Sequence, residues 1–172
     1  MKSLKILAVL VAGVMGVVSG MAQEGVTAGS TAVFTVPTLI RLELSTDLID
    51  FGALTMDDYD LGYKDALGAQ IVYVWSNRPW TLSVAANSET WTGPWEKPSK
   101  DLQLRVAAVN RPERITYLMD TLTGLSTDVI TLAQGLPGGN FQHTMDFRVL
   151  VSWDNDVAGD YSLGFKYTLT AP

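Results

Sequence analysis

The end of the chain carries the pattern that most limits its fold. Residues 161–172 read YSLGFKYTLTAP, in which every second residue from Tyr161 to Leu169 is aromatic or leucine. The residues between them are serine, glycine, lysine or threonine. Because successive side chains of a strand point to opposite faces of a sheet, this alternation predicts a strand with one buried and one solvated face.

Short runs of the same kind recur along the chain, separated by glycine, proline, asparagine and aspartate. Regularly spaced short strands with turn residues between them are typical of a sandwich or barrel. We therefore predict an all-β fold, a single Ig-like or pilin-like antiparallel β-sandwich of about nine strands. The expected strands are residues 31–36, 39–44, 70–75, 80–86, 102–108, 115–119, 129–133, 145–153 and 161–172, with a short strand or turn at 48–52.

Two pairs of neighbouring runs are expected to form β-hairpins. Residues 70–75 and 80–86 are joined by a short turn, and residues 145–153 and 161–172 are joined by another. The acidic segment 57–65 predicts a loop, with a short helical turn as the alternative.

The tryptophans and one proline give further local expectations. Trp80 and Trp153 fall on strand faces whose other members are aliphatic, so both are expected in the core, together with Trp75. Pro37 lies between two predicted strands. Since proline cannot donate to a sheet ladder, it should mark a strand break or an edge.

The first 22 residues have the features of a secretory signal peptide. Lys2 and Lys5 precede an apolar run over residues 6–18, and Gly-Met-Ala at 20–22 supplies small residues for cleavage after Ala22. The alternative is a retained membrane anchor, although the run is short for a span of about 20 residues. We expect export to the cell surface or the extracellular medium, with periplasmic transit as one route. The mature chain, 23–172, would form the single domain.

The composition excludes several kinds of modification and partner. The chain has no cysteine, so disulfides and a lipidated cysteine are excluded. It holds 12 Lys and Arg against 18 Asp and Glu; without the two signal-peptide lysines, 10 cations face 18 acids. Nucleic acids and anionic membranes are bound by clustered Lys and Arg, so this excess of acidic residues argues against both as partners.

The sequence contains no recognisable set of catalytic residues. His143 is the only histidine, and no Gly-x-Ser-x-Gly turn accompanies it. One histidine without cysteine also fails to supply the usual zinc ligands. Glycosidases use a pair of carboxylates, but among eighteen acidic residues some pair will always lie close together, so such a pair does not indicate a glycosidase. We predict a protein that is not an enzyme and holds no cofactor.

Two tryptophans stand apart from the strand runs. Trp91 and Trp95 are four residues apart in polar surroundings, with Gly93 and Pro94 between them. Such a pair suits an exposed aromatic platform that stacks on sugar rings or anchors a partner. The alternative is that both rings fold back and cap one end of the sandwich.

Two acidic clusters raise the question of calcium. Closely spaced carboxylate oxygens are the ligands that Ca²⁺ prefers, and extracellular calcium is plentiful. Neither cluster has the terminal bidentate glutamate of a calcium loop, and aspartate is also an ordinary turn residue. Calcium therefore stays an alternative to plain turns. The candidate ligands are Asp57, Asp58 and Asp60 in one cluster, and Asp154, Asp156 and Asp160 in the other.

Short motifs resemble bacterial exported surface proteins. Residues 80–82 form a Trp-x-Leu triplet, and residues 167–169, close to the end, repeat it with tyrosine in place of tryptophan. This layout is similar to WxL cell-surface proteins, which attach non-covalently to the bacterial cell wall. Asp-Phe-Gly at 50–52 and Ala-Gly-Asp-Tyr at 158–161 resemble pilin-like and spore-coat-like sandwiches. The resemblance implies an Ig-like sandwich displayed on a bacterial surface.

Two functions follow as expectations. The first is a non-catalytic structural or adhesive surface protein, whose partners are further copies or other surface proteins. Ala32, Phe34 and Val36 alternate after a small, polar segment at 23–30, which suits strand addition to a neighbour's sheet, unless the segment pairs within its own domain. The alternative function is a carbohydrate- or cell-wall-binding module that uses Trp91 and Trp95.

Overall fold

The computed structural model describes residues 28–172. Residues 36–172 form one compact unit, and residues 28–35 belong to a separate N-terminal unit. The predicted signal peptide, 1–22, lies outside the described residues. Among residues 28–172, no helix has the length and apolar character needed to cross a membrane.

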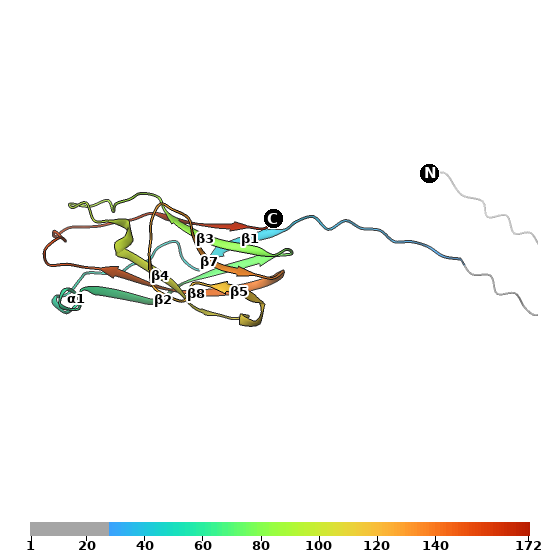
Figure 1. The fold of residues 1–172 in the computed structure, drawn as a ribbon, viewed down its shortest axis with the longest axis horizontal. Helices are drawn as coiled ribbons and strands as arrows, with labels where there is room; N and C mark the ends of the chain where they lie inside the picture. The colour runs from blue at the N-terminus through green and yellow to red at the C-terminus, as the bar shows by residue number, and fades with distance from the viewer. Residues whose placement is uncertain (1–27) are drawn as a thin grey trace, which may run out of the picture. The chain divides into compact units, whose positions relative to one another are not determined.

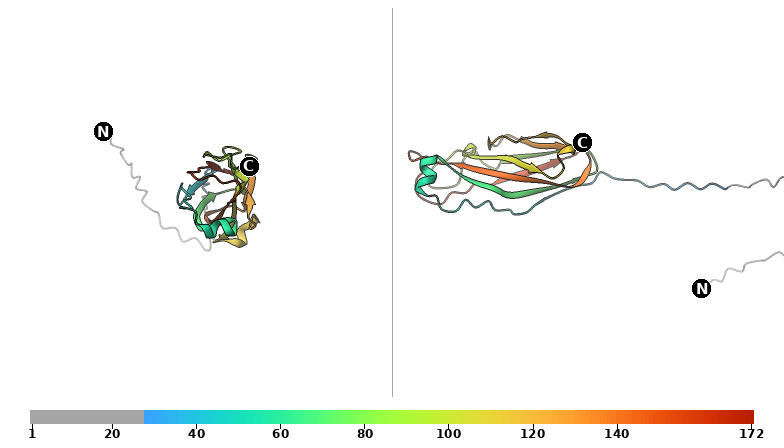
Figure 2. Two further views of the ribbon diagram at one scale, coloured as in Figure 1. Left: turned by 90° about the vertical axis from the view of Figure 1, so that its left-hand side faces the viewer. Right: turned by 90° about the horizontal axis from the view of Figure 1, so that it is seen from below.

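Two antiparallel sheets make up the compact unit, which confirms the predicted nine-stranded β-sandwich (Figures 1 and 2). Besides the strands there is one helix, α1 (Met56–Leu61), and two single turns of 3-10 helix at Ser99–Asp101 and Pro112–Arg114. The first sheet has the order β1 (Ile40–Leu44), β2 (Tyr63–Ser76), β8 (Gly138–Leu150), β4 (Leu102–Val109) and β6 (Thr123–Gly124), and the second has the order β5 (Ile115–Leu118), β7 (Ile130–Gly135), β3 (Trp80–Ala86) and β9 (Phe165–Thr170).

The core lies between the two sheets, where each contributes alternate side chains. This is the expected consequence of period-two patterning, since one face of every strand is apolar. The central strands bury their inner rows almost completely. Those rows are Val72 and Val74 of β2, Leu102, Leu104 and Val106 of β4, Met145, Phe147 and Val149 of β8, and Leu82 and Val84 of β3.

Both predicted hairpins are wrong. β2 and β3 follow one another in the chain but lie in different sheets, and so do β8 and β9. The apolar rows of each pair point into the same core from opposite sides, so the connecting segment crosses between sheets. Alternation shows that a strand is half-buried, but it does not identify the strand beside it.

The tryptophans also divide differently from the expectation. Trp80 is 2% exposed, as predicted, whereas Trp153 is 59% exposed. β8 ends at Leu150, so Trp153 lies beyond the strand and packs on Tyr59 of α1, with ring centroids 4.5 Å apart. Trp75 is only partly buried, because it lies on the outer face of β2 beneath Arg41.

Two local predictions near the start need correction. No strand forms at residues 31–36, and the first strand begins at Ile40. Pro37 therefore lies before the sheet and does not separate two strands. Residues 56–61 form helix α1, the alternative to a plain loop. Thr55 and Asp58 form a capping box at its start, and Gly62 ends it with φ of 79°, a conformation that glycine adopts without strain.

The strands run between two ends of the sandwich. The α1 end is formed by residues 54–64, 87–101, 125–129 and 151–164. Tyr63 of β2 and Leu102 of β4 pair with Leu150 and Val149 of β8 there, and the Ala86 N–H, at the end of β3, donates to the Ser126 carbonyl. The opposite end, which we call the β1-entry end, holds the turns at 77–79, 110–114 and 136–140. It also holds the start of β1 and the C-terminus (Figure 1).

Candidate functional site

The apolar row of β1 is left uncovered. Leu42 and Leu44 pair in register with Val74 and Val72, which are completely buried, so the even-numbered side chains of β1 face the core side. Ile40 belongs to the same row. Yet Ile40 is 47% and Leu44 40% exposed, and only Leu42 is partly buried. The second sheet therefore fails to cover the β1 edge of the first.

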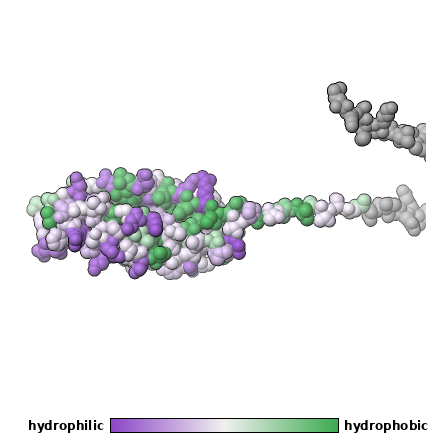
Figure 3. All heavy atoms as spheres, turned by 90° about the horizontal axis from the view of Figure 1, so that it is seen from above, coloured by the Kyte–Doolittle hydropathy of each residue, from purple (hydrophilic) through white to green (hydrophobic). Residues whose placement is uncertain are grey.

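The matching edge of the second sheet is β9. It lies beside β1 across the sandwich and, within the described part of the chain, pairs only with β3. Phe165, Tyr167 and Leu169 point inward, in register with buried residues of β3, but all three are only partly buried. We call these three residues together with Ile40, Leu42 and Leu44 the β1–β9 seam. Seen from above, the sandwich shows green apolar areas between purple polar ones (Figure 3).

The backbone of β9 is open to a further strand. An edge strand leaves one row of its N–H and C=O groups without a ladder partner, and proteins usually guard such edges with proline, charge or bulges. β9 has no proline, its pairing with β3 shows no register shift, and its one charged residue is Lys166. The edge of β9 is therefore well suited to strand pairing.

A polar bridge keeps the seam in place. The Tyr167 hydroxyl donates to Gln70 Oε1 at 2.6 Å, and Gln70 Nε2 donates to the Thr46 carbonyl at 2.6 Å. Burial raises the pKa of Tyr167 well above its usual range. The phenol therefore stays a neutral donor at any physiological pH, and it ties β9 to β2 behind β1.

The segment before β1 exposes its apolar side chains. Residues 28–39 have no regular secondary structure, and Val33 and Phe34 are 89% and 87% exposed. Asn77, in the turn after β2, holds the end of this segment. Its side chain donates to the Pro37 carbonyl at 2.7 Å and accepts from the Leu39 N–H at 2.8 Å.

The two candidate tryptophans are placed differently. Trp91 is partly buried and packs on the core, whereas Trp95 is 48% exposed. Trp95 lines a pocket of about 430 Å³ at the α1 end, together with Lys97, Asp101, Ser152 and Asp156. An aromatic platform at this place would consist of the single Trp95 ring beside a polar pocket.

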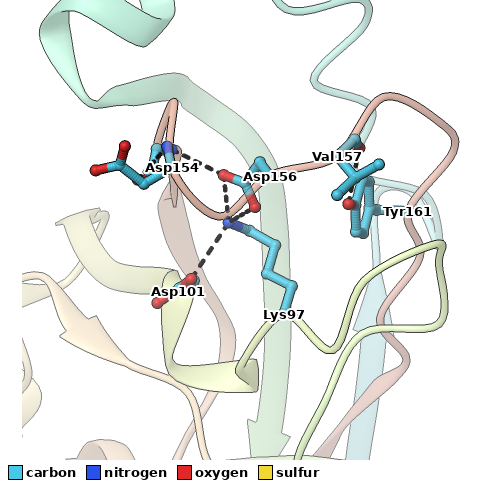
Figure 4. Close-up of polar contacts among 7 residues, drawn as sticks. Lys97, Asp101, Asp154, Asp156, Val157 and Tyr161 are labelled. Atoms are coloured by element: carbon cyan, nitrogen blue, oxygen red, sulfur yellow. Dashed lines mark hydrogen bonds and ion pairs between the residues drawn. The ribbon is translucent and has the colours of Figure 1, made fainter.

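Lys97 and Asp156 form a buried ion pair in this pocket. The Lys97 side chain is 6% exposed, and its ammonium lies 2.8 Å from Asp156 Oδ1 and 3.2 Å from Asp101 Oδ2 (Figure 4). Asp156 also accepts the Ser152 N–H at 2.8 Å. The cluster joins segment 87–101 to segment 151–164. Nothing in the sequence pattern pointed to it, because the two segments are far apart in the chain.

The six aspartates of the calcium hypothesis have other surroundings. Asp58 accepts from the Thr55 backbone and hydroxyl and pairs with Lys64, and the Thr55 bonds, foremost the backbone one, hold its pKa below the usual value. Asp156 is paired with Lys97, and Asp60 accepts from Trp153 at 3.4 Å. Asp57, Asp154 and Asp160 are exposed. In the part of the chain that the structure describes, no three acidic or histidine side chains gather closely enough to hold a metal ion.

His143 is part of the core. It is completely buried, its Nδ1 lies 3.2 Å from the Val72 carbonyl, and its ring meets the edge of Trp80 at 5.4 Å. Nε2 has no hydrogen-bond partner among residues 28–172. Burial lowers the pKa of His143, with a smaller opposing effect from the bond to Val72. The protonation of this buried ring is therefore coupled to the stability of the fold.

We expect the free energy of unfolding to fall as the pH drops below about 6.5. The unfolded chain binds a proton at its ordinary histidine pKa, while the folded chain, with its lowered pKa, does not. At pH 5 the loss is up to about 2 kcal/mol if the buried ring stays neutral. Urea unfolding at pH 5 to 8 measures it. His143→Leu should flatten the profile above pH 5, and an unchanged slope in that variant would assign the effect to carboxylates instead.

The two Trp-x-Leu-like triplets lie on neighbouring strands. Leu82 of β3 pairs with Leu169 of β9, and Thr81 pairs with Thr170. The fold thus brings residues 80–82 and 167–169 together at the strand that borders the seam. Comparison with models of known protein families gave no match, and a search of curated proteins found no relative.

Proposed function

We propose that this chain is a non-catalytic structural subunit of the bacterial cell surface, which assembles with further copies by strand addition. One observation carries the proposal: the sandwich is incomplete at the β1–β9 seam. Ile40 and Leu44 are 47% and 40% exposed on the core side of β1, next to the unpaired edge of β9. One more strand beside β9 would cover them.

The strand comes from a second copy, through residues 31–36. This segment has six residues, as many as β9, and its alternate residues Ala32, Phe34 and Val36 are apolar. Paired with β9, it would turn these side chains toward the exposed row of β1. Backbone hydrogen bonds would provide binding, and the alternate side chains would provide register.

Apolar burial supports the proposed contact. Burying a Phe or Val side chain contributes about 1.5–3 kcal/mol, and covering Ile40 and Leu44 adds to it. Association costs translational and rotational freedom, so one added strand must be well fitted to be stable. Secretion fits the same proposal, since a signal peptide is expected at 1–22 and the remaining chain is acidic.

We expect Phe34→Asp to weaken assembly by at least about 10–100-fold, because a charge replaces the largest side chain on the inserting face. Val33→Asp is the matched control: it adds the same charge one residue earlier, on the opposite face. The full-length gene is expressed in an exporting bacterial host, and the purified protein is followed by light scattering and electron microscopy over a range of concentrations.

The control separates strand insertion from a general effect of charge. Assembly by the Val33→Asp protein, with loss in the Phe34→Asp protein, supports the proposal. Equal loss in both variants would contradict it, since residue 33 does not face the seam. A wild-type protein that stays monomeric at every concentration would indicate instead that the segment pairs within its own chain.

A further inference from the structure

The α1 end of the sandwich is strongly acidic. Its four segments, residues 54–64, 87–101, 125–129 and 151–164, hold ten carboxylates and three lysines. Lys64 and Lys97 are neutralised by ion pairs with aspartates, so Lys100 is the remaining cation. Seven carboxylates there are exposed, and none forms an ion pair with a described residue: Asp57, Asp60, Glu89, Glu96, Asp128, Asp154 and Asp160.

The β1-entry end has the opposite sign. Its turns at 77–79, 110–114 and 136–140 hold three arginines and one glutamate. Arg78 is exposed, Arg111 is partly exposed above the Phe141 ring, and Arg114 donates to the Pro137 carbonyl. None of the three forms an ion pair with a described residue. The two ends of the sandwich therefore carry opposite unpaired charge.

We infer that copies of this chain stack end to end, with the acidic α1 end of one copy against the basic β1-entry end of the next. The partner is a second copy of the chain, and the reason is charge complementarity. Contacts of α1 end with α1 end, or of two β1-entry ends, would place like charges together, which disfavours them. The contact is heterologous, so it extends into a filament if it does not close into a ring.

This inference rests on the proposed function and adds the direction in which the inserted strand would run. The segment 31–36 leads into β1 at the β1-entry end, so in such a stack it would reach the seam of the next copy from that copy's α1 end. It would then run opposite to β9, which starts at the α1 end. The charges would thus favour antiparallel pairing of the added strand with β9.

A pair of charge-reversed proteins tests the stacking. In the first, Arg78→Glu and Arg111→Glu make the β1-entry end acidic. In the second, four exposed acids of the α1 end become lysine, so that both of its ends are basic. Each protein alone then presents like charges to its own copies, while the two proteins are complementary to each other. The four changes are Asp57→Lys, Glu96→Lys, Asp154→Lys and Asp160→Lys.

We expect each reversed protein alone to assemble at least about tenfold more weakly than the wild type at low salt, and an equimolar mixture to recover assembly. Sedimentation velocity and light scattering measure both. Recovery on mixing shows complementarity, which simple damage to either protein would not produce. Lys100→Glu is the control: it reverses an exposed cation at the already acidic α1 end and should not weaken assembly.

The outcomes separate this inference from the proposed function. If Phe34→Asp abolishes assembly while both reversed proteins assemble alone like the wild type, strand addition stands and end-to-end stacking is overturned. If Phe34→Asp assembles normally while the mixture alone recovers, stacking stands and strand addition falls. Failure of the mixture to recover overturns stacking, and a wild-type protein that never assembles overturns both.

Discussion

Replacing Lys97 by methionine should lower the free energy of unfolding by about 3–5 kcal/mol, the usual cost of breaking a buried ion pair from one side. Methionine keeps most of the aliphatic stem but removes the ammonium. Asp156, whose side chain is 5% exposed, would then keep a buried charge with only the Ser152 N–H as its partner. Urea or thermal unfolding followed by circular dichroism gives the number.

Two further variants show whether the charge is the cause. Lys100→Met makes the same chemical change on an exposed neighbour and should alter stability by less than about 0.5 kcal/mol. The double variant Lys97→Met with Asp156→Leu removes both charges and should regain much of the loss, since buried pairs contribute little net stability against apolar replacements. A double variant that is as unstable as the sum of both single variants would mean that packing, not charge, is decisive.

The second large effect distinguishes two tryptophans. Trp80→Ala should cost about 3–5 kcal/mol, because the ring is 2% exposed and packs on Phe141 with centroids 5.1 Å apart. The indole also donates to the Leu136 carbonyl at 3.1 Å. The Gly135 backbone lies so close that a Cβ there would meet the ring at 2.4 Å. The cavity left by alanine therefore has rigid walls and cannot collapse easily.

Trp153→Ala is the matched comparison. Trp153 is 59% exposed and loses mainly its contact with Tyr59, so about 0.5–1.5 kcal/mol is expected. Parallel chemical denaturation of the two variants is the measurement. Similar losses would contradict the chain path described above, in which β8 ends before Trp153 and the following segment leaves the sandwich.

The sequence predicted the class of the fold and much of the core. Alternating runs gave the inner row of Met145, Phe147 and Val149, all of which are buried. It did not predict which strands pair with each other. Period-two alternation indicates which face of a strand is apolar, but it does not indicate which strand lies beside it. For that reason both expected hairpins proved to be strands of opposite sheets.

The sequence predicted only one of the two parts of the candidate site, the segment that would insert. The alternation of Ala32, Phe34 and Val36 suggested a strand that could add to another sheet. The other half could not be predicted, because Ile40 and Leu44 have the pattern of fully covered residues. Their exposure depends on how far the second sheet extends, which is a property of the packed sheets and not of the strand itself.

By itself, the sequence determined that this chain folds as a β-sandwich, because alternating apolar side chains must bury one face of each strand. It also set the residues available for chemistry: no cysteine, one histidine and an excess of acids. Only the tertiary structure decided which strands became edges and where charges from distant segments gathered. These features arise when residues far apart in the chain come together, and the local sequence pattern does not show which distant residues will meet.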